Sequence, residues 1–147
     1  MPSFINRRQM TVAWGDCDPA GIVFNPRFFE YFDNATWMLF DAALGVKPQD
    51  LARVYGIIGI PLVDVRGNFL KPVRFGDTVE IVTQVTEFRR SSFTVAHVLT
   101  VGGETAVEGF EVRVWAGCDK DDPDKMASTA IPDDVIARFG PASPPGV

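Results

Sequence analysis

Residues 14–33 read WGDCDPAGIVFNPRFFEYFD and contain an abrupt change from a loop to a helix. The first part holds two glycines, one proline and two aspartates, a composition typical of an ordered loop. Asn25 is then a good N-cap and Pro26 suits the first helical position, while Gly45 can supply a left-handed stop. The pattern therefore predicts a helix from Pro26 to Leu44.

This helix is expected to be apolar over most of its circumference. Its apolar residues are Phe28, Phe29, Tyr31, Phe32, Ala35, Met38, Leu39, Phe40, Ala42 and Leu44. A helix of this kind is normally enclosed by other elements. Asp33 lies off the narrow stripe that the other polar residues form, so we expect it to point towards an interior or an interface.

The chain after Ile57 changes to β-branched residues with a period of two, which indicates at least four strands. Residues 89–91 (RRS) and the Gly102-Gly103 pair are typical hairpin turns, so the strands that they join should be antiparallel neighbours. A short first strand around Arg7 to Ala13 and a terminal helix beginning at Pro132 complete the expected elements.

These elements predict an α+β domain in which an antiparallel sheet curls around one long helix. Residues 1–140 are expected to form this single domain, and residues 141–147 a disordered tail. Many strands are apolar on both faces, so the sheet should pack against a second copy of the chain and form an oligomer.

The bulk composition argues against several classes of function. The net charge of −5 disfavours nucleic-acid binding, and the absence of a signal peptide or a long apolar segment disfavours membrane insertion. The two cysteines form no CxxC pair, which suits a reducing cytoplasm. His97 is the only histidine, so one chain cannot build a histidine triad or a multi-histidine metal site. No metal and no cofactor are predicted.

Residues 14–33 resemble the opening of the 4-hydroxybenzoyl-CoA thioesterase family of hot-dog-fold proteins. Further similar segments are YGIIGIPLV (55–63), FLKPVRFGDTVEI (69–81) and EFRRSSF (87–93), and the resemblance covers about residues 8–116. It implies a five- or six-stranded antiparallel sheet around one helix, dimers that usually pair into tetramers, and active sites at the dimer interface. It also implies hydrolysis of an acyl-CoA thioester.

By this resemblance Asp18 is the catalytic carboxylate. It either attacks the thioester carbonyl or activates water, and the sequence leaves both routes open. The free amides at the start of the predicted helix suit a developing oxyanion. Because Pro26 has no N–H, the donor is expected to be Asn25 or Arg27, and the family pattern points to the Asn25 amide.

The resemblance also implies which residues bind the CoA moiety of the substrate. Arg89 and Arg90 match basic residues that family members place against CoA phosphates, whereas Ser91 stands where a third basic residue is common. The alternative is that the two arginines form only a solvated hairpin tip.

For the acyl group, Asp33, Ile60 and Pro61 are the expected substrate-binding residues. In the 4-hydroxybenzoyl-CoA enzymes an aspartate and a threonine bind the phenol hydroxyl, and here Ile60 replaces the threonine. Losing that partner weakens selection for the phenol, so a related aryl or a short-to-medium acyl group is also expected. Asp33 taken alone could instead be an ordinary helix aspartate.

Other functions remain as alternatives. Asp16 and Asp18 could simply be turn residues that bond their own backbone. Cys17 invites a thiol mechanism, although no partner base is visible, and a packed thiol is the simpler interpretation. A hydratase normally needs a histidine in the active loop, which this chain lacks. A non-catalytic acyl-CoA or acyl-carrier-protein binding module is the main alternative.

Overall fold

The long helix has the predicted bounds. In the computed structural model, which describes residues 4–140, helix α1 spans Pro26–Leu44. It ends at Gly45, whose φ of 66° is the left-handed conformation that glycine adopts without strain. The predicted tail at residues 141–147 lies outside the described residues.

Five strands form one antiparallel sheet in the order β1-β3-β4-β5-β2. Their bounds are Ile5–Thr11 for β1, Leu62–Phe69 for β2, Thr78–Phe88 for β3, Ser92–Val101 for β4 and Glu104–Val114 for β5. The first strand lies two residues earlier than predicted. The chain turns at Val12, whose amide donates to the Asp77 carbonyl at 2.9 Å, and then enters the short 3-10 helix η1, Trp14–Asp16.

Both predicted hairpins are present. Strands β3 and β4 pair directly on either side of residues 89–91, and β4 and β5 pair on either side of Gly102 and Gly103. These glycines have φ values of 59° and 81°, which are strained for residues with a side chain. Consecutive hairpins of this kind place β3, β4 and β5 side by side in the sheet.

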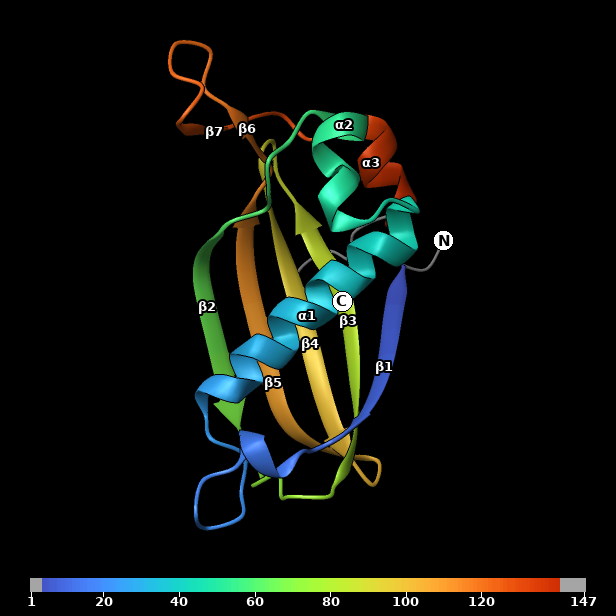
Figure 1. Cartoon of the computed structure of the whole chain (residues 1–147). Coiled ribbons are helices and arrows are strands. Elements are labelled where there is room, and N and C mark those ends of the chain that lie inside the picture. The colour runs from blue at the N-terminus through green and yellow to red at the C-terminus, as the bar shows by residue number, and fades with distance from the viewer. Residues whose placement is uncertain (1–3, 141–147) are drawn as a thin grey trace.

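Several short elements lie at one end of the sheet (Figure 1). They are η2 (Pro48–Asp50), α2 (Leu51–Tyr55), β6 (Ala116–Cys118), β7 (Met126–Ser128) and α3 (Asp133–Arg138). The sequence did not predict α2 or the β6–β7 pair. The terminal helix begins one residue later than predicted, because Pro132 is extended, with ψ 144°, and is its N-cap.

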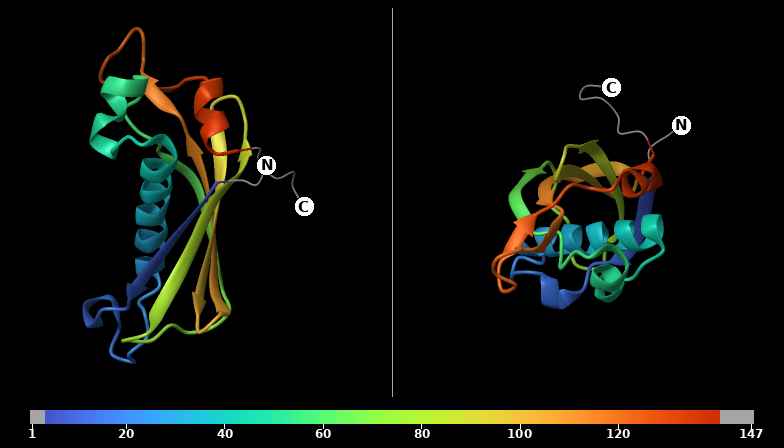
Figure 2. Two further views of the ribbon diagram at one scale, coloured as in Figure 1. Left: turned by 90° about the vertical axis from the view of Figure 1, so that its right-hand side faces the viewer. Right: turned by 90° about the horizontal axis from the view of Figure 1, so that it is seen from above.

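The concave face of the sheet holds the core and curls around α1 (Figure 2). On β4 the residues Phe93, Val95, His97 and Leu99 are all buried, at every second position of the strand. Within one chain α1 is not fully enclosed as expected, since the sheet covers the helix from one side only. The exposed positions of α1 are Pro26, Glu30, Asn34, Met38 and Ala42.

Strand β2 is an edge strand with an unusually open surface. Only Gly67 is half-buried, and the remaining residues of the strand are exposed, including Val63 at 62% and Val65 at 40%. An exposed apolar edge strand can pair with a strand of another chain. Within residues 4–140, no helix is both long enough and apolar enough to cross a membrane.

Candidate active site

The loop before α1 folds back on itself. The Asp18 amide donates to the Ile22 carbonyl at 2.9 Å, and the Phe24 amide donates to the Asp16 carbonyl at 2.9 Å. A third bond, from the Val23 amide to the Val73 carbonyl at 2.8 Å, fixes the returning segment. The loop is therefore ordered by its backbone, and it leads directly into the first turn of the helix.

Asp18 is half-buried in this loop. Its Oδ1 accepts the Ala20 amide at 2.8 Å, which is the turn role considered as the alternative to catalysis. Its Oδ2 has no hydrogen bond to any residue within 4–140. The turn bond therefore orients the carboxylate and leaves one oxygen available for chemistry.

Asp16 differs from Asp18 in its partners. Its Oδ2 accepts the Tyr31 hydroxyl at 2.9 Å, and its Oδ1 lies 3.7 Å from the Arg27 Nε. Burial, followed by this bond to Asp16, raises the pKa of Tyr31, so the phenol stays protonated and donates. Asp16 thus fastens the loop to α1.

The Cys17 thiol has little nucleophilic character. Its Sγ donates to the Ala13 carbonyl at 3.6 Å. Desolvation and the neighbouring carboxylates of Asp16 and Asp18 raise the pKa of this thiol. Because the thiolate is the reactive form, a raised pKa disfavours a thiol mechanism.

The start of α1 corrects two expectations about Asn25 and Arg27. Asn25 is helical, with φ −47° and ψ −43°, so its side chain makes no capping bond. The Arg27 amide donates to the Phe24 carbonyl at 2.8 Å and is not a free oxyanion donor. The Asn25 amide makes no hydrogen bond to residues 4–140, which leaves it as the available donor. A surface pocket lined by Asn25, Phe28 and Leu70, among others, adjoins it.

Asp33 and Ile60 meet through Arg113, a residue that the sequence did not single out. Arg113 donates to Asp33 Oδ1 at 2.6 Å and to the Ile60 carbonyl at 3.0 Å. Ile60 is buried, whereas the Asp33 side chain is 46% exposed. Pro61 contributes a carbonyl that accepts the Val114 amide at 3.0 Å. A signal was present in the sequence, because Glu111 and Arg113 are charged residues that alternate with Phe110 and Val112 and so fall on the same face of β5.

The Glu111 carboxylate is the internal partner of Arg113. Burial alone would raise the pKa of Glu111, but hydrogen bonds from His97 and Arg113 outweigh it and lower that pKa. Burial likewise opposes the charge of Arg113, yet its bonds to Glu111 and Asp33 raise the pKa of the guanidinium. Both groups are therefore charged in the folded chain.

The proposed CoA residues lie at the other end of the sheet. Arg89 donates to Glu87 Oε2 at 2.8 Å and to Thr94 Oγ1 at 3.1 Å, while Arg90 is exposed. The Ser91 carbonyl accepts the Trp115 amide at 2.8 Å. The loop that holds Asp18 adjoins the first residue of β3, and the arginines follow its last residue, about 35 Å away at ~3.3 Å per residue. One chain alone does not bring them together.

Comparison with known proteins agrees with this architecture. The sequence model of the thioesterase-like superfamily matches residues 12–139. A 4-hydroxybenzoyl-CoA thioesterase from Pseudomonas sp. (strain CBS-3) is 32% identical, over 87% of this chain and 92% of the relative.

Solved structures give the same result. A mutant 4-hydroxybenzoyl-CoA thioesterase complexed with 4-hydroxybenzoyl-CoA has a TM-score of 0.85 and 25% identity, covering 93% of this chain and 99% of that one. A gentisyl-coenzyme A thioesterase has a TM-score of 0.76 and 33% identity, with coverages of 89% and 99%. This chain has the hot-dog fold and belongs to the thioesterase-like superfamily.

Proposed function

We propose that this enzyme hydrolyses an acyl-CoA thioester to a free acid and CoA, with Asp18 as its reacting carboxylate. The observation that carries the proposal is that the two oxygens of the Asp18 carboxylate differ in their hydrogen bonding. One oxygen is fixed by the Ala20 amide, and the other is unbonded within residues 4–140. An anchored carboxylate with one available oxygen suits either a nucleophile or a general base.

The Asn25 amide is the proposed oxyanion donor. The loop places Asp16 beside Phe24, next to the start of α1, and Asp18 follows two residues later, at most about 7 Å further along the chain. If the thioester carbonyl lies between these two groups, its carbon faces the Asp18 carboxylate and its oxygen accepts a hydrogen bond from the Asn25 amide. Losing such a donor typically raises a barrier by about 3 kcal/mol.

Two chemical routes fit this arrangement. In the first, the free Asp18 oxygen attacks the carbonyl carbon, CoA leaves as the thiolate, and water hydrolyses the resulting anhydride. In the second, Asp18 takes a proton from a water molecule that attacks the same carbon. In both, the Asn25 amide stabilises charge on the carbonyl oxygen.

The proposed substrate is an aromatic acyl-CoA, such as 4-hydroxybenzoyl-CoA or a related aryl ester, with short-to-medium acyl groups as the next candidates. Relatives with 4-hydroxybenzoyl and gentisyl substrates support the aromatic class. The exposed pair of Arg89 and Arg90 would bind the CoA phosphates. Ser91 offers only a hydroxyl there, and Asp33, Ile60 and Pro61 would border the acyl group.

The complete site is proposed to form between chains, within a dimer that pairs into a homotetramer in the cytoplasm. Two observations support this assembly. The carboxylate and the arginines of one chain are separated by the length of β3, and the open edge of β2 offers a surface for a second copy. A two-fold axis beside β2 would place the Asp18 end of one chain next to the arginine end of its partner.

The test is release of free CoA from a panel of acyl-CoAs by wild type, Asp18→Asn and Asp16→Asn. The panel holds 4-hydroxybenzoyl, benzoyl, phenylacetyl, butyryl and octanoyl esters. Asp18→Asn keeps the acceptor for Ala20 but should lose at least about a hundredfold in kcat. Asp16→Asn keeps an acceptor for Tyr31 and should retain most of the activity.

Two results would contradict the proposal. If Asp18→Asn is as active as wild type, the carboxylate assignment is wrong. If wild type binds acyl-CoA esters but cleaves none of them, the chain is a binding module, and thioester hydrolysis is excluded as its function.

A further inference from the structure

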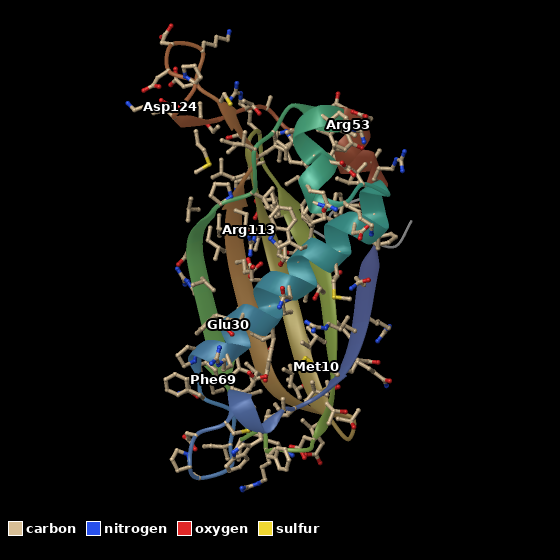
Figure 3. All side chains as sticks on the ribbon, viewed as in Figure 1. Met10, Glu30, Arg53, Phe69, Arg113 and Asp124 are labelled. Atoms are coloured by element: carbon tan, nitrogen blue, oxygen red, sulfur yellow. The ribbon has the colours of Figure 1, made fainter. Side chains whose placement is uncertain are left out.

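A buried ionic cluster between α1 and the sheet has no part in the proposed chemistry at Asp18. Its centre is the pair of Arg113 and Glu111, whose side chains are 3% and 1% exposed. Arg113 Nε lies 3.0 Å from Glu111 Oε1, and its Nη2 lies 3.1 Å from Oε2, so the two groups pair as a fork. Figure 3 shows Arg113 beside the middle of α1.

A contribution to folding stability does not explain why Arg113 and Glu111 are buried here. Removing two charges from water costs several kcal/mol per ion, and a well-packed apolar pair often stabilises a core equally well. Neighbouring strand positions such as Val95 and Val107 are apolar and fully buried. A role in positioning other groups explains the cluster better.

Hydrogen bonds from α1 and the sheet hold Glu111 in place. The Thr36 hydroxyl donates to Glu111 Oε1 at 2.5 Å. Because that hydroxyl has one hydrogen, its contact with His97 Nε2 at 3.2 Å requires the imidazole to donate. His97 Nε2 also lies 3.3 Å from Glu111 Oε1, and its Nδ1 lies 2.8 Å from the Thr83 hydroxyl. Groups from α1 and the sheet therefore fix Glu111.

The other donors of Arg113 reach outwards. Nη1 binds the Ile60 carbonyl at 3.0 Å and Nη2 binds Asp33 Oδ1 at 2.6 Å. Asp33 Oδ2 has no hydrogen bond to residues 4–140, and the side chain is about half exposed. The guanidinium therefore joins α1 to the segment before β2 and leaves one carboxylate oxygen facing outwards.

We propose that Arg113 is a positioning residue that sets acyl-group selectivity, by holding Asp33 and the Ile60 carbonyl in one fixed frame. The inference rests on the proposed function, in which Asp33 borders the acyl group. The cluster contains two carboxylates and one guanidinium, so its outward oxygen is an acceptor with net negative surroundings. It favours an acyl group that carries a hydroxyl or amino donor and repels one that ends in a carboxylate.

The test compares hydrolysis of 4-hydroxybenzoyl-CoA, benzoyl-CoA and 4-carboxybenzoyl-CoA by wild type and Arg113→Lys. Lysine keeps the charge, but one ammonium cannot hold Glu111, Asp33 and the Ile60 carbonyl together. Wild type should prefer the hydroxyl ester over the benzoyl ester by about tenfold or more in kcat/KM. Arg113→Lys should reduce kcat/KM about tenfold more for the hydroxyl ester than for the benzoyl ester.

Asp33→Asn, which keeps an oxygen acceptor for Arg113 on a half-exposed side chain, should reduce the same preference. Arg53→Lys is the matched control, since Arg53 is an exposed arginine on α2 whose single ion pair among residues 4–140 is with Asp50. A general loss of structure would lower kcat/KM for all three esters equally, and only a positioning role changes their ratio.

Three outcomes overturn the inference. Wild type could show no preference for the hydroxyl ester, Arg113→Lys could keep the wild-type ratio, or Asp33→Asn could keep it when Arg113→Lys does not fold. In each case thioester cleavage by wild type would leave the proposed function standing. The remaining case is a wild type that cleaves no ester. Calorimetry then measures whether it binds non-hydrolysable thioether analogues of the hydroxyl and benzoyl esters. If wild type cleaves no ester and binds neither analogue, the proposed function and this inference fail together.

Discussion

The Tyr31 hydroxyl donates to Asp16 Oδ2 at 2.9 Å, which joins the second turn of α1 to the loop that carries Asp18. Tyr31 is 5% exposed, so the bond is shielded from solvent. It is the only side-chain hydrogen bond between this loop and α1 among residues 4–140. Asp16, which is not itself the proposed catalyst, therefore helps to fix the position of the loop that carries Asp18.

Tyr31→Phe should lower the free energy of unfolding by about 1–2 kcal/mol, because it leaves the half-buried Asp16 carboxylate without its donor. The activity should also fall, since the Asp18 loop loses its anchor. Urea denaturation and steady-state kinetics measure the two effects. An unchanged unfolding midpoint would show that the bond contributes nothing to the loop.

Substitutions of Asn25 separate its side chain from its amide. Asn25→Ala should keep nearly full activity, because the side chain makes no capping bond. Asn25→Pro removes the N–H at a φ of −47°, near the proline range, and should lower kcat by about a hundredfold. Circular dichroism checks that α1 still forms. Equal activity of the two variants would exclude this amide as the oxyanion donor.

Gly109→Ala should destabilise the core by about 1–3 kcal/mol. An added Cβ would lie 2.5 Å from Cε2 of Phe32, whose ring stacks on His97 at a centroid distance of 4.7 Å. Gly67→Ala is the matched control. A Cβ added at Gly67 would lie 3.2 Å from Cζ of Phe69, and because that ring is exposed it can shift to make room. Thermal unfolding should show a clearly larger loss for Gly109→Ala than for the control.

The ion pair of Glu111 predicts a loss of stability in acid. The pKa of Glu111 is lowered on folding, so its contribution is complete above the ordinary value of 4.5 and is lost as the pH falls through the lower folded value. Urea denaturation at pH 7, 5, 4 and 3 measures this dependence. Glu111→Gln should be less stable than wild type at pH 7 and should lose less between pH 5 and 3. Parallel pH profiles would assign the acid sensitivity to other groups.

A charge on the β2 edge tests the proposed assembly. Val65 is 40% exposed and shares the face of Glu111, with which it pairs in register. Val65→Lys should give a monomer that retains its fold and loses activity, because the complete site needs a second chain. Sedimentation velocity measures the size. Gln9→Lys on the opposite edge strand should behave as wild type, and an oligomeric, active Val65→Lys would place the interface elsewhere.

Local signals predicted much of the fold correctly. Pro26 and Gly45 fixed the bounds of α1, and the Gly102-Gly103 pair fixed the turn between β4 and β5. These features depend on the backbone preferences of a few consecutive residues, which are visible in a sequence. The short α2 and the β6–β7 pair were missed, since five- and three-residue elements carry too little periodicity to be recognised.

Within the site, the sequence by itself determined which residues stand in the loop before α1 and where that helix begins. Only the tertiary structure decided the partners: Asp16 meets Tyr31, and Asp33 meets Arg113 across 80 positions of the chain. It also decided that the Arg27 amide is engaged and the Asn25 amide is available. Turns and helix ends follow from neighbours along the chain, whereas a buried charge finds its partner only when strand register and helix packing bring distant residues together.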